Sequence, residues 1–374
     1  MSGIYIHIPY CKQACHYCDF HFSTNTKTKL DLIDALCQEI TIQKEYLYNK
    51  EIKTIYFGGG TPSLLEEKEL KKILGVIQTN FSVSADAEIT MEVNPDDLSA
   101  EKLKIIYNNG INRLSIGIQS FNDDFLKLFN RAHNAQMAED SIIEARSAGF
   151  ENISVDLIFG IPNQSTSEFE NDLKKIIDLD TEHVSIYGLT IEEKTVFGKW
   201  LDTNKIQPID EEFAAVQLEM IMNELPKAGF RQYEISNFSK PGFESKHNSN
   251  YWTQEHYLGI GPSAHSYNGN SRQNNISNNA KYITSVSNGK IPFELEKLDL
   301  SQKINEYILT RIRTLEGIPL DQLKTQFHFD LVDNFKPSIK TFKDSGLIVV
   351  DNNLHLTQKG KLVADSITQS FMID

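Results

Sequence analysis

The sequence predicts an α/β fold with a parallel sheet, followed by a small winged-helix-like α+β domain. Two observations predict this fold. Through residue 235, short runs rich in β-branched and aromatic residues alternate with segments of helical periodicity, as in repeated βα units. After residue 300, three helical segments precede two short strands, which is the order of a winged helix. The 374 residues suffice for two or three domains with cores of their own.

Six strands are expected in the first part of the chain, with helical segments between them. Their predicted cores are residues 3–8, 53–57, 88–93, 113–118, 154–159 and 184–189. Polar residues follow three of these strands directly, at 58–62, 92–95 and 119–120, so we expect the functional residues at the C-terminal edge of the sheet. Periodicity alone fits either an open doubly wound sheet or a barrel.

The charge balance argues against a nucleic-acid partner. The chain carries 37 Lys and Arg against 51 Asp and Glu, a formal net charge of -14, so it lacks the basic surface that phosphate binding needs. The N-terminal residues do not have the pattern of a signal peptide, and the sequence contains no run of about 18 apolar residues. We therefore expect a cytoplasmic protein without an integral membrane segment.

The chain is expected to divide into three parts, which are residues 1–235, a loop-rich extension at 236–298 and the winged-helix-like domain at 299–374. In the extension, residues 268–279 contain six Asn and are expected to form an exposed connection. From residue 301 onward, nine basic residues balance nine acidic ones, so we expect this domain to pack or to bind a partner rather than DNA. Its predicted helices and strands are 304–312, 320–327, 331–342, 347–350 and 354–356, with a final helix after them.

Three of the four cysteines lie close together, directly after the first predicted strand. Their spacing is C-x3-C-x2-C, and three thiolates in so short a loop can converge on one soft metal centre. The predicted metal ligands are Cys11, Cys15 and Cys18. Spacing alone also allows zinc, with His16 or His21 as a fourth ligand. Cys37 falls on the apolar face of a helical segment, so we expect it to be a buried core residue.

The residues around the cysteines resemble a known family. Residues 5–11 read Y-I-H-I-P-Y-C, the C-x3-C-x2-C spacing follows, and residues 58–62 read G-G-G-T-P. This combination resembles the radical S-adenosylmethionine (SAM) superfamily and, within it, the oxygen-independent coproporphyrinogen III oxidase group. The resemblance implies an incomplete parallel (β/α)6 barrel rather than a doubly wound sheet. It continues over nearly the whole chain, at residues 92–95, 115–121, 130–133, 156–162 and 259–265.

The resemblance implies a [4Fe-4S] cluster on the three cysteines and SAM as a second cofactor. Three protein ligands leave one iron of a four-iron cluster open, and in the family SAM chelates that iron through its amino and carboxylate groups. Reduction of the cluster then cleaves SAM to methionine and a 5′-deoxyadenosyl radical. No protein side chain is assigned a catalytic role. The residues expected to bind SAM are Tyr5, Gly59, Gly60, Thr61, Glu92, Gln119, Arg131 and Asp156.

These residues have the chemistry that SAM binding requires. Glycines at positions 59 and 60 let a ligand approach the backbone closely. Glu92 and Asp156 can accept hydrogen bonds from the ammonium or hydroxyl groups of SAM. Gln119 and Arg131 can hold its ribose and its carboxylate. Tyr5 alternates with isoleucines in the first strand, so we expect it to face the barrel interior beside the cluster.

Two features distinguish the subtypes of this group. The oxidases carry a fourth cysteine two residues after the third and a longer N-terminal segment, whereas this chain has Phe20 at that position and only two residues before Gly3. Residues 247–252 read H-N-S-N-Y-W, which resembles the H-N-x-x-Y-W signature of the family's haem chaperones. The resemblance therefore implies a chaperone that binds haem and transfers it to an acceptor apo-protein. The alternatives are oxidative decarboxylation of coproporphyrinogen III and a structural zinc or iron-sulfur protein.

The same signature implies where haem binds. His247 is a candidate axial ligand, and Tyr251 and Trp252 can cover a porphyrin face or edge. An acidic protein repels the two haem propionates, so we expect a cation nearby. The candidate cations are Lys246, Arg231 and Arg272. Alternatively, this loop only closes the open side of the barrel, with its two aromatic residues as an apolar plug.

Overall fold

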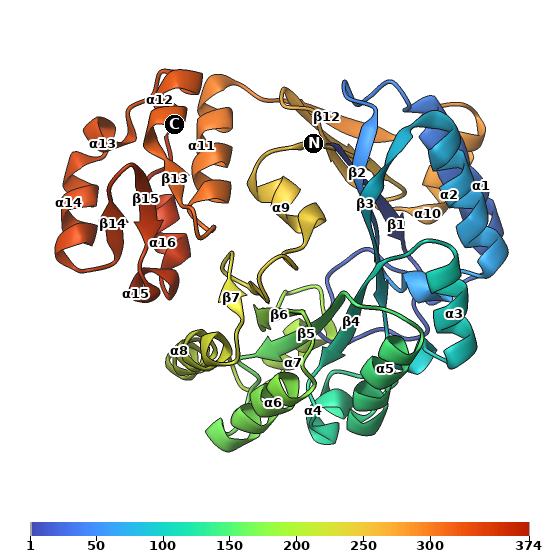
Figure 1. The fold of residues 1–374 in the computed structure, drawn as a ribbon, viewed down its shortest axis with the longest axis horizontal. Coiled ribbons are helices and arrows are strands. Elements are labelled where there is room, and N and C mark those ends of the chain that lie inside the picture. The colour runs from blue at the N-terminus through green and yellow to red at the C-terminus, as the bar shows by residue number, and fades with distance from the viewer. Residues whose placement is uncertain (1, 374) are drawn as a thin grey trace.

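The computed structural model describes residues 2–373 and contains the predicted parallel sheet (Figure 1). Six parallel strands follow one another in chain order, each hydrogen-bonded to the next. They are β1 (Ser2–Ile8), β2 (Glu51–Gly59), β3 (Ser82–Val93), β4 (Arg113–Gln119), β5 (Ile153–Phe159) and β6 (His183–Gly188). Five of the six predicted strand cores lie inside these strands, and the sixth is displaced by one residue.

Further strands extend the sheet on both sides without closing it. They are β7 (Arg231–Gln232), β8 (Asn237–Ser239), β9 (His256–Ile260), β10 (His265–Tyr267), β11 (Ser271–Asn275) and β12 (Phe293–Lys297). β9 pairs parallel with β1, whereas β8 pairs antiparallel with β6. Over residues 2–373 the sheet has the order β12-β11-β10-β9-β1-β2-β3-β4-β5-β6-β8-β7, and its two ends do not pair. The predicted incomplete barrel is therefore confirmed.

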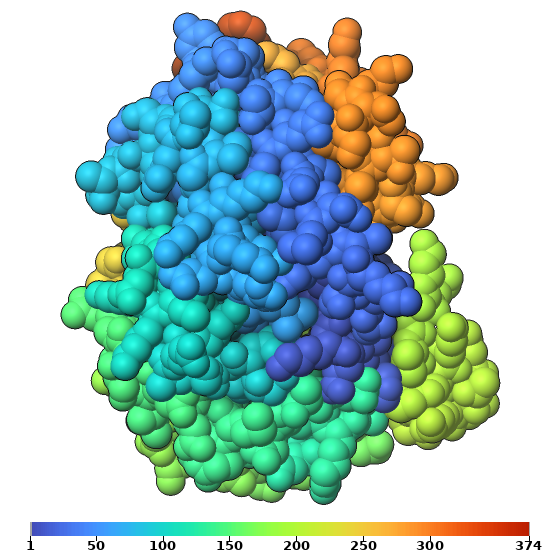
Figure 2. Space-filling view, turned by 90° about the vertical axis from the view of Figure 1, so that its right-hand side faces the viewer, coloured from blue at the N-terminus to red at the C-terminus, as the bar shows by residue number. Residues whose placement is uncertain are grey.

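Helices cover the outer face of the barrel, as Figures 1 and 2 show. They are α1 (Lys29–Ile42), α2 (Glu67–Asn80), α3 (Ala100–Asn108), α4 (Asp123–Leu128), α5 (Ala135–Ser147), α6 (Thr166–Asp178), α7 (Val196–Asp202) and α8 (Glu211–Lys227). In α1, Leu32, Leu36 and Ile40 recur at helical spacing and are fully buried, while Asp34 faces solvent. Cys37 lies on this buried face, as predicted from its position in the helix.

Residues 236–298 contain more regular structure than predicted. Besides strands β8 to β12 they form helices α9 (Lys246–Trp252) and α10 (Asn279–Ser287). The asparagine-rich run is not an exposed connection, because part of it forms β11, in which Gln273 and Asn275 are buried. Asn275 Nδ2 donates to Glu39 Oε1 at 2.7 Å, and the Tyr282 hydroxyl donates to the same carboxylate. These bonds attach the extension to α1, which explains why polar side chains are buried there.

The last part of the chain has the predicted winged-helix order and a hydrophobic core of its own. The expected helix at 331–342 divides in two, and Pro337 lies at the start of the second half, where the missing N–H of proline is tolerated. A short strand, β13, was not predicted; it pairs with β15. The elements are α11 (Leu300–Arg311), β13 (Ile318–Pro319), α12 (Leu320–Phe327), α13 (Leu331–Asn334), α14 (Lys336–Asp344), β14 (Ile348–Val350), β15 (Asn353–Leu356), α15 (Gln358–Lys361) and α16 (Ala364–Gln369).

Candidate functional site

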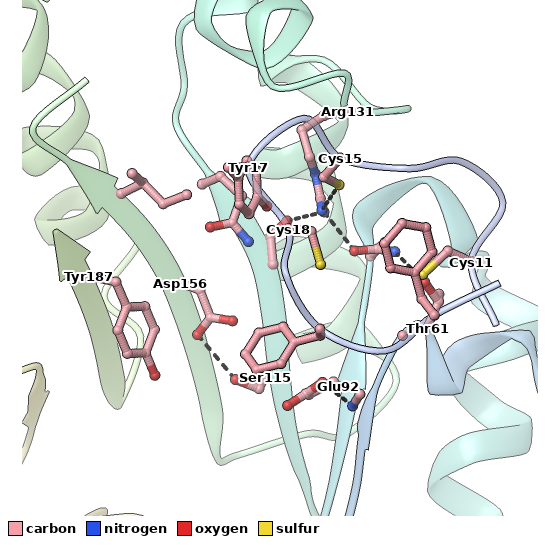
Figure 3. Close-up of a pocket in the computed structure, with 18 of the residues that line it drawn as sticks. Cys11, Cys15, Tyr17, Cys18, Thr61, Glu92, Ser115, Arg131, Asp156 and Tyr187 are labelled. Carbon is pink, nitrogen blue, oxygen red and sulfur yellow. Dashed lines mark hydrogen bonds between the residues drawn. The ribbon is translucent and has the colours of Figure 1, made fainter. Parts of the chain in front are cut away.

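A cavity of about 570 Å³ occupies the inside of the barrel. It begins under the loop that carries the three cysteines and extends to Asn248 of helix α9. Strands β2 to β6 all contribute to its wall, because side chains that face the interior alternate along each strand. Figure 3 shows residues of neighbouring strands beneath the cysteine loop, among them Glu92, Ser115, Asp156 and Tyr187.

The cysteine loop is held in place by the turn that precedes Arg131. Gln13 Nε2 donates to the carbonyl of Asn130 at 2.6 Å, and Asn130 Nδ2 donates to the carbonyl of Ala14 at 2.7 Å. Asn130 has a φ of +58°, a left-handed conformation that asparagine tolerates better than most residues. This one turn therefore positions both the loop and the arginine that follows it.

The three cysteines of the loop are free thiols and line the cavity. Burial raises the pKa of Cys11, and it raises the pKa of Cys18 to about 11, so a bound cation is needed to hold these groups as thiolates at neutral pH. Over residues 2–373, no three His, Cys, Asp or Glu side chains surround a single-ion site. Three thiols presented by one loop are the soft donors that iron-sulfur clusters take, so the donor set fits a cluster.

The two histidines near the cysteines do not line the cavity. His16 Nδ1 is hydrogen-bonded to the carbonyl of Leu128 at 2.8 Å, and its ring contacts Trp200 edge-on. His21 Nε2 lies 2.7 Å from Asn279 Oδ1. Both side chains are therefore used elsewhere in the fold, and the zinc site that the spacing also allowed lacks a histidine ligand in this arrangement.

Glu92 of β3 is a half-buried carboxylate beside Gly58 and Gly59. Its Oε1 accepts a hydrogen bond from the Tyr56 hydroxyl at 2.9 Å, and its Oε2 accepts one from the Gly59 N–H at 3.1 Å. Burial nevertheless raises the pKa of Glu92 to about 7. Gly59 has a φ of +107°, and a Cβ there would lie 2.5 Å from the His7 ring, so glycine alone fits. At Gly60 a Cβ would lie 2.8 Å from two backbone carbonyl oxygens.

A second half-buried carboxylate, Asp156, lies on β5. Ser115 Oγ donates to its Oδ1 at 3.2 Å, and a hydrogen bond from Ser185 also stabilises the ionised form. Burial outweighs these contacts and raises the pKa of Asp156 to about 6. Glu92 and Asp156 therefore face one cavity as carboxyl groups that ionise close to neutral pH, a property that is frequent at functional sites.

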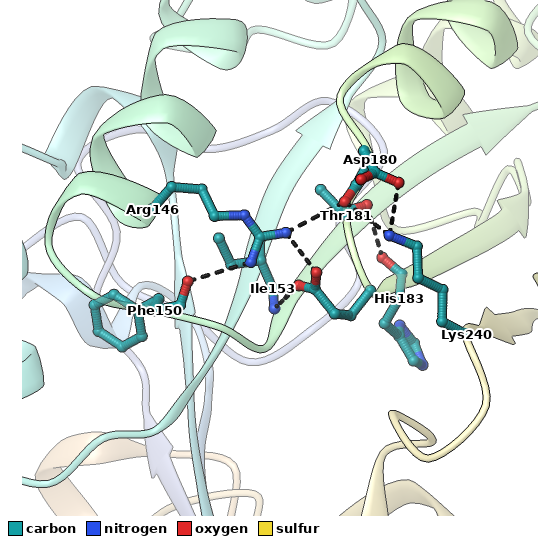
Figure 4. A network of polar contacts seen from close by, with 8 residues as sticks. Arg146, Phe150, Ile153, Asp180, Thr181, His183 and Lys240 are labelled. Carbon is teal, nitrogen blue, oxygen red and sulfur yellow. Dashed lines mark hydrogen bonds and ion pairs between the residues drawn. The ribbon is translucent and has the colours of Figure 1, made fainter.

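A polar network fixes the N-terminal ends of β5 and β6, the strands that carry the far wall of the cavity (Figure 4). Arg146 Nη2 lies 2.6 Å from Glu182 Oε1, and the other carboxylate oxygen accepts from the Ile153 N–H at 3.1 Å. Lys240 Nζ lies 2.7 Å from Asp180 Oδ1. Glu182 is buried whereas Asp180 is exposed, so the Arg146 pair contributes more to holding this edge.

Arg131 lies at the cysteine end of the cavity. Its Nη2 donates to Asn94 Oδ1 and to a backbone carbonyl of β4, both at 2.6 Å, and its Nη1 lies 3.4 Å from Cys15 Sγ. Asn94 Nδ2 donates in turn to Thr61 Oγ1 at 3.1 Å. Gln119 ends β4 with a φ of +73°, a strained backbone that often occurs at ligand sites. The structure thus brings these predicted residues together at one end of the cavity.

Tyr5 faces the barrel interior as expected, where its ring stacks on that of Tyr56, but it does not line the cavity. Its hydroxyl is hydrogen-bonded to His7 Nδ1 at 3.1 Å, and a Cβ at Gly58 would lie 2.9 Å from its ring. His7 Nε2 is hydrogen-bonded to the carbonyl of His21 at 3.0 Å, in the segment after the cysteines. Tyr5 supports the wall in this way, and a direct contact with SAM stays a prediction.

The H-N-x-x-Y-W segment forms a helix inside the barrel, which corrects the expectation of a loop. His247 in α9 is only 1% exposed, and each ring nitrogen has a partner: Nδ1 lies 2.8 Å from Thr54 Oγ1, and Nε2 lies 2.9 Å from the Tyr251 hydroxyl. Burial lowers the pKa of His247 to about 3. The indole N–H of Trp252 is buried and has no hydrogen-bond acceptor within residues 2–373. Neither nitrogen of His247 is open to an iron in this arrangement.

The three cations predicted to meet haem propionates do not line the cavity, and their contact with haem stays a prediction. Lys246 Nζ donates to a backbone carbonyl of β3 at 3.3 Å. Arg272 forms an ion pair with Glu306. Arg231 is exposed in β7, at one end of the sheet. Lys246 was chosen because it is adjacent to His247 in sequence, and the two arginines because of their charge. Neither property places a side chain on the cavity wall.

Two residues of the cavity wall, Arg113 and Asn248, are not predicted from the sequence. A signal for Arg113 exists, because Arg113, Ser115 and Gln119 occupy alternate positions of β4 and therefore face the interior together. A charged residue at an interior position of a buried strand is unusual and indicates function. Asn248 belongs to the H-N-x-x-Y-W signature, but the local sequence does not show that it lines the cavity, because its position depends on where α9 packs.

Comparison with known protein families agrees with this geometry. The model described as "Radical SAM superfamily" matches residues 5–176, and the model described as "HemN C-terminal domain" matches residues 298–363. The fold is shared with the structure described as "Coproporphyrinogen III oxidase (HemN) from Escherichia coli is a Radical SAM enzyme", with a TM-score of 0.85. That likeness covers 99% of this chain and 89% of the other at 23% sequence identity, so it bears on the fold alone.

Two curated relatives match along their whole length. A protein of Bacillus subtilis (strain 168) named "Heme chaperone HemW" is 37% identical over 376 residues, which is all of this chain and 99% of the relative. A protein of the same name from Escherichia coli (strain K12) is 32% identical over 379 residues, which is all of this chain and 98% of the relative. Both the sheet and the C-terminal domain therefore have counterparts in these relatives.

Proposed function

Because the chain belongs to the radical SAM family of the proteins named "Heme chaperone HemW", we propose that it binds haem and transfers it to an acceptor apo-protein. The observation that carries this proposal is the 37% identity over all of this chain and 99% of the relative. The cavity supports it, because a large pocket that combines aromatic rings with many polar and charged side chains can hold an organic cofactor with polar groups.

The cysteine end of the cavity is the proposed cluster and SAM site. The residues that would hold a [4Fe-4S] cluster are Cys11, Cys15 and Cys18. When bound, the cluster supplies an electron to SAM. Arg131 would orient the carboxylate of SAM, and Asn94 fixes the guanidinium for this role. Glu92, held by Tyr56 and a backbone N–H, would accept hydrogen bonds from the amino group. Gln119 and Asp156 would hold the ribose hydroxyls.

Helix α9 is the proposed wall for haem. Asn248, the second residue of the H-N-x-x-Y-W signature, already lines the cavity, and His247 lies next to it in the helix. His247 has to release the Tyr251 hydroxyl before Nε2 can ligate an iron, because that nitrogen has a partner in the structure. Tyr251 and Trp252 then lie on the same short helix, where they can cover a porphyrin edge.

Replacing His247 by alanine should change the Soret band of bound haem and lower the midpoint of thermal unfolding. The change leaves the hydroxyls of Thr54 and Tyr251 without this partner, which costs about 1–3 kcal/mol for each buried group. Absorption spectra of the haem complex and thermal unfolding measure the two effects. Tyr251→Phe, which removes only the partner of Nε2, should keep the Soret band. An unchanged Soret band in folded His247→Ala would show that α9 only closes the open side of the barrel and does not ligate haem.

Phe20 argues against the alternative function, oxidative decarboxylation of coproporphyrinogen III. It lines the cavity and is 73% exposed, at the position where the oxidases of this group have a fourth cysteine. A phenyl ring supplies no thiol to the substrate or the cluster. We therefore infer that this chain retains the fold of the oxidase and uses its cavity for a different purpose.

One experiment on one sample tests the proposed function. The protein is reconstituted anaerobically with iron and sulfide, and haem is titrated in while the Soret band is followed. A haem-free b-type cytochrome serves as the probe acceptor. We expect saturable haem binding and transfer to this acceptor, and no vinyl product when coproporphyrinogen III, SAM and a reductant are supplied instead. Vinyl formation over several turnovers would show that the chain is a coproporphyrinogen III oxidase. Absence of haem binding would refute the proposed chaperone function.

The winged-helix-like domain is the proposed contact for a partner protein. Its nine basic and nine acidic residues from position 301 onward give no net positive surface for phosphates. In residues 2–373 no helix has both the length and the apolar character needed to cross a membrane. Binding to a haem-requiring acceptor protein, the cytoplasmic location and the lack of a nucleic-acid partner stay predictions.

A further inference from the structure

Arg113 is a buried cation without a direct partner among residues 2–373. It begins β4, is 1% exposed and lines the cavity. Within residues 2–373 its guanidinium takes part in no ion pair or hydrogen bond, and its Nε is among the buried polar atoms left without an acceptor. Arg131, the other arginine that lines the cavity, also has an Nε without an acceptor, but its Nη2 donates to two oxygen atoms.

A buried charge without a partner destabilises a fold strongly, so its presence needs a reason. No group within residues 2–373 pairs directly with Arg113. Its charge contributes to lowering the pKa values of His183 and His247, both of which stay neutral. The charge of Arg113 also lowers the pKa of Asp156, a carboxylate of the same cavity, but Asp156 accepts its hydrogen bonds from serines and forms no ion pair with Arg113 in the part of the chain described. A ligand anion is therefore the missing counter-charge.

Arg113 lies at the opposite end of the cavity from the cysteines. Gln119, at the cysteine end, is six residues further along the same strand, which corresponds to about 20 Å of extended chain. Arg131 already occupies the cysteine end, where the carboxylate of SAM is proposed to bind. The carboxylate that meets Arg113 therefore belongs to a second ligand, which lies deeper in the barrel.

We propose that Arg113 binds a carboxylate of this deeper ligand and selects for ligands that carry one. The inference rests on the proposed function, in which that ligand is haem and the carboxylate is a propionate. The surroundings fit a flat ligand with an acidic edge, because Tyr56, Tyr187 and Ile158 line the cavity together with the amide of Asn248. The propionate cation of the sequence prediction is thus Arg113 rather than Lys246.

Two porphyrins and two variants test this proposal. Haem and haem dimethyl ester, in which both propionates are neutral, are titrated into the reconstituted protein, into Arg113→Gln and into Arg231→Gln. We expect the wild type and Arg231→Gln, which removes an exposed cation outside the cavity, to bind haem more tightly than the ester. Arg113→Gln should lose about tenfold to a hundredfold in haem affinity and show no preference. Equal haem affinity in Arg113→Gln and wild type would overturn the inference while leaving the proposed function intact.

Thermal unfolding of the protein without porphyrin provides a second readout. Arg113→Met should unfold at a higher temperature than the wild type, because it removes an unpaired buried charge and keeps an apolar chain of similar length. A lower unfolding temperature would show that Arg113 is a structural residue and would overturn the inference.

Benzoate, a small aromatic carboxylate, separates this inference from the proposed function. If the wild type binds no haem, the proposed function fails. Stabilisation of the wild type, but not of Arg113→Gln, by benzoate would then still support the carboxylate site. If benzoate stabilises the wild type and Arg113→Gln equally, or stabilises neither, the inference that Arg113 binds a carboxylate is overturned.

Discussion

Replacing Cys15 by serine should remove nearly all iron and sulfide from the anaerobically reconstituted protein. Cys15 is one of three thiols that line the cavity from a single loop, so its loss leaves only two protein ligands for a four-iron cluster. A serine hydroxyl stays protonated at neutral pH and is a poor ligand for this soft metal centre. Iron and sulfide analysis, with the visible charge-transfer absorbance, measures the loss. Cys11→Ser and Cys18→Ser should behave in the same way.

Cys37→Ser is the matched control. Cys37 has the same chemistry but lies on the buried face of α1 and does not line the cavity. Its replacement should retain the iron and cost about 1 kcal/mol or more of folding stability, because a hydroxyl replaces a thiol among apolar neighbours. The assignment of the cluster ligands fails if Cys37→Ser loses as much iron as Cys15→Ser. It also fails if Cys15→Ser keeps the iron content of the wild type.

The barrel strands were predictable from sequence because their signal is local. In β4, Leu114, Ile116 and Ile118 alternate with residues that face the cavity, and the same pattern recurs in β5. The cysteine spacing and the glycine run are equally local, so most of the SAM end of the site could be located. The choice of a barrel over an open sheet needed the family resemblance, because parallel βα units have the same periodicity in both folds.

The haem end of the site was less predictable because it depends on contacts between distant segments. His247 is buried by Thr54, which lies 193 residues earlier, and nothing in the local sequence indicates that α9 packs inside the barrel. The strand β11 was missed for a similar reason, since Asn275 is buried by bonding to Glu39. Polar residues of this kind read as exposed loops until their hydrogen-bond partners are known.

Replacing Glu92 by glutamine should weaken SAM binding by about tenfold to a hundredfold at pH 8 and should change its pH dependence. The pKa of Glu92 is raised to about 7, chiefly by burial, so its carboxyl is protonated in acid and ionised in base. Only the ionised carboxylate offers both oxygens to the amino group of SAM while accepting from Tyr56 and Gly59. Calorimetric titration of the reconstituted proteins from pH 5.5 to 8 measures both effects.

In the wild type, SAM affinity should therefore rise with pH and level off above about pH 7, because below that value the carboxyl must release a proton to bind. Each pH unit below 7 costs up to about tenfold in affinity by the same linkage. Protons that SAM itself exchanges affect the wild type and Glu92→Gln alike, so the difference between the slopes of their affinity against pH isolates the contribution of Glu92.

Glu234→Gln is the matched control for this measurement. Burial raises the pKa of Glu234 to about 7 as well, but Glu234 does not line the cavity, so its replacement should leave the slope unchanged. Identical slopes in the wild type and Glu92→Gln would show that the carboxylate does not bind the amino group, and the assignment of this wall to SAM would fail.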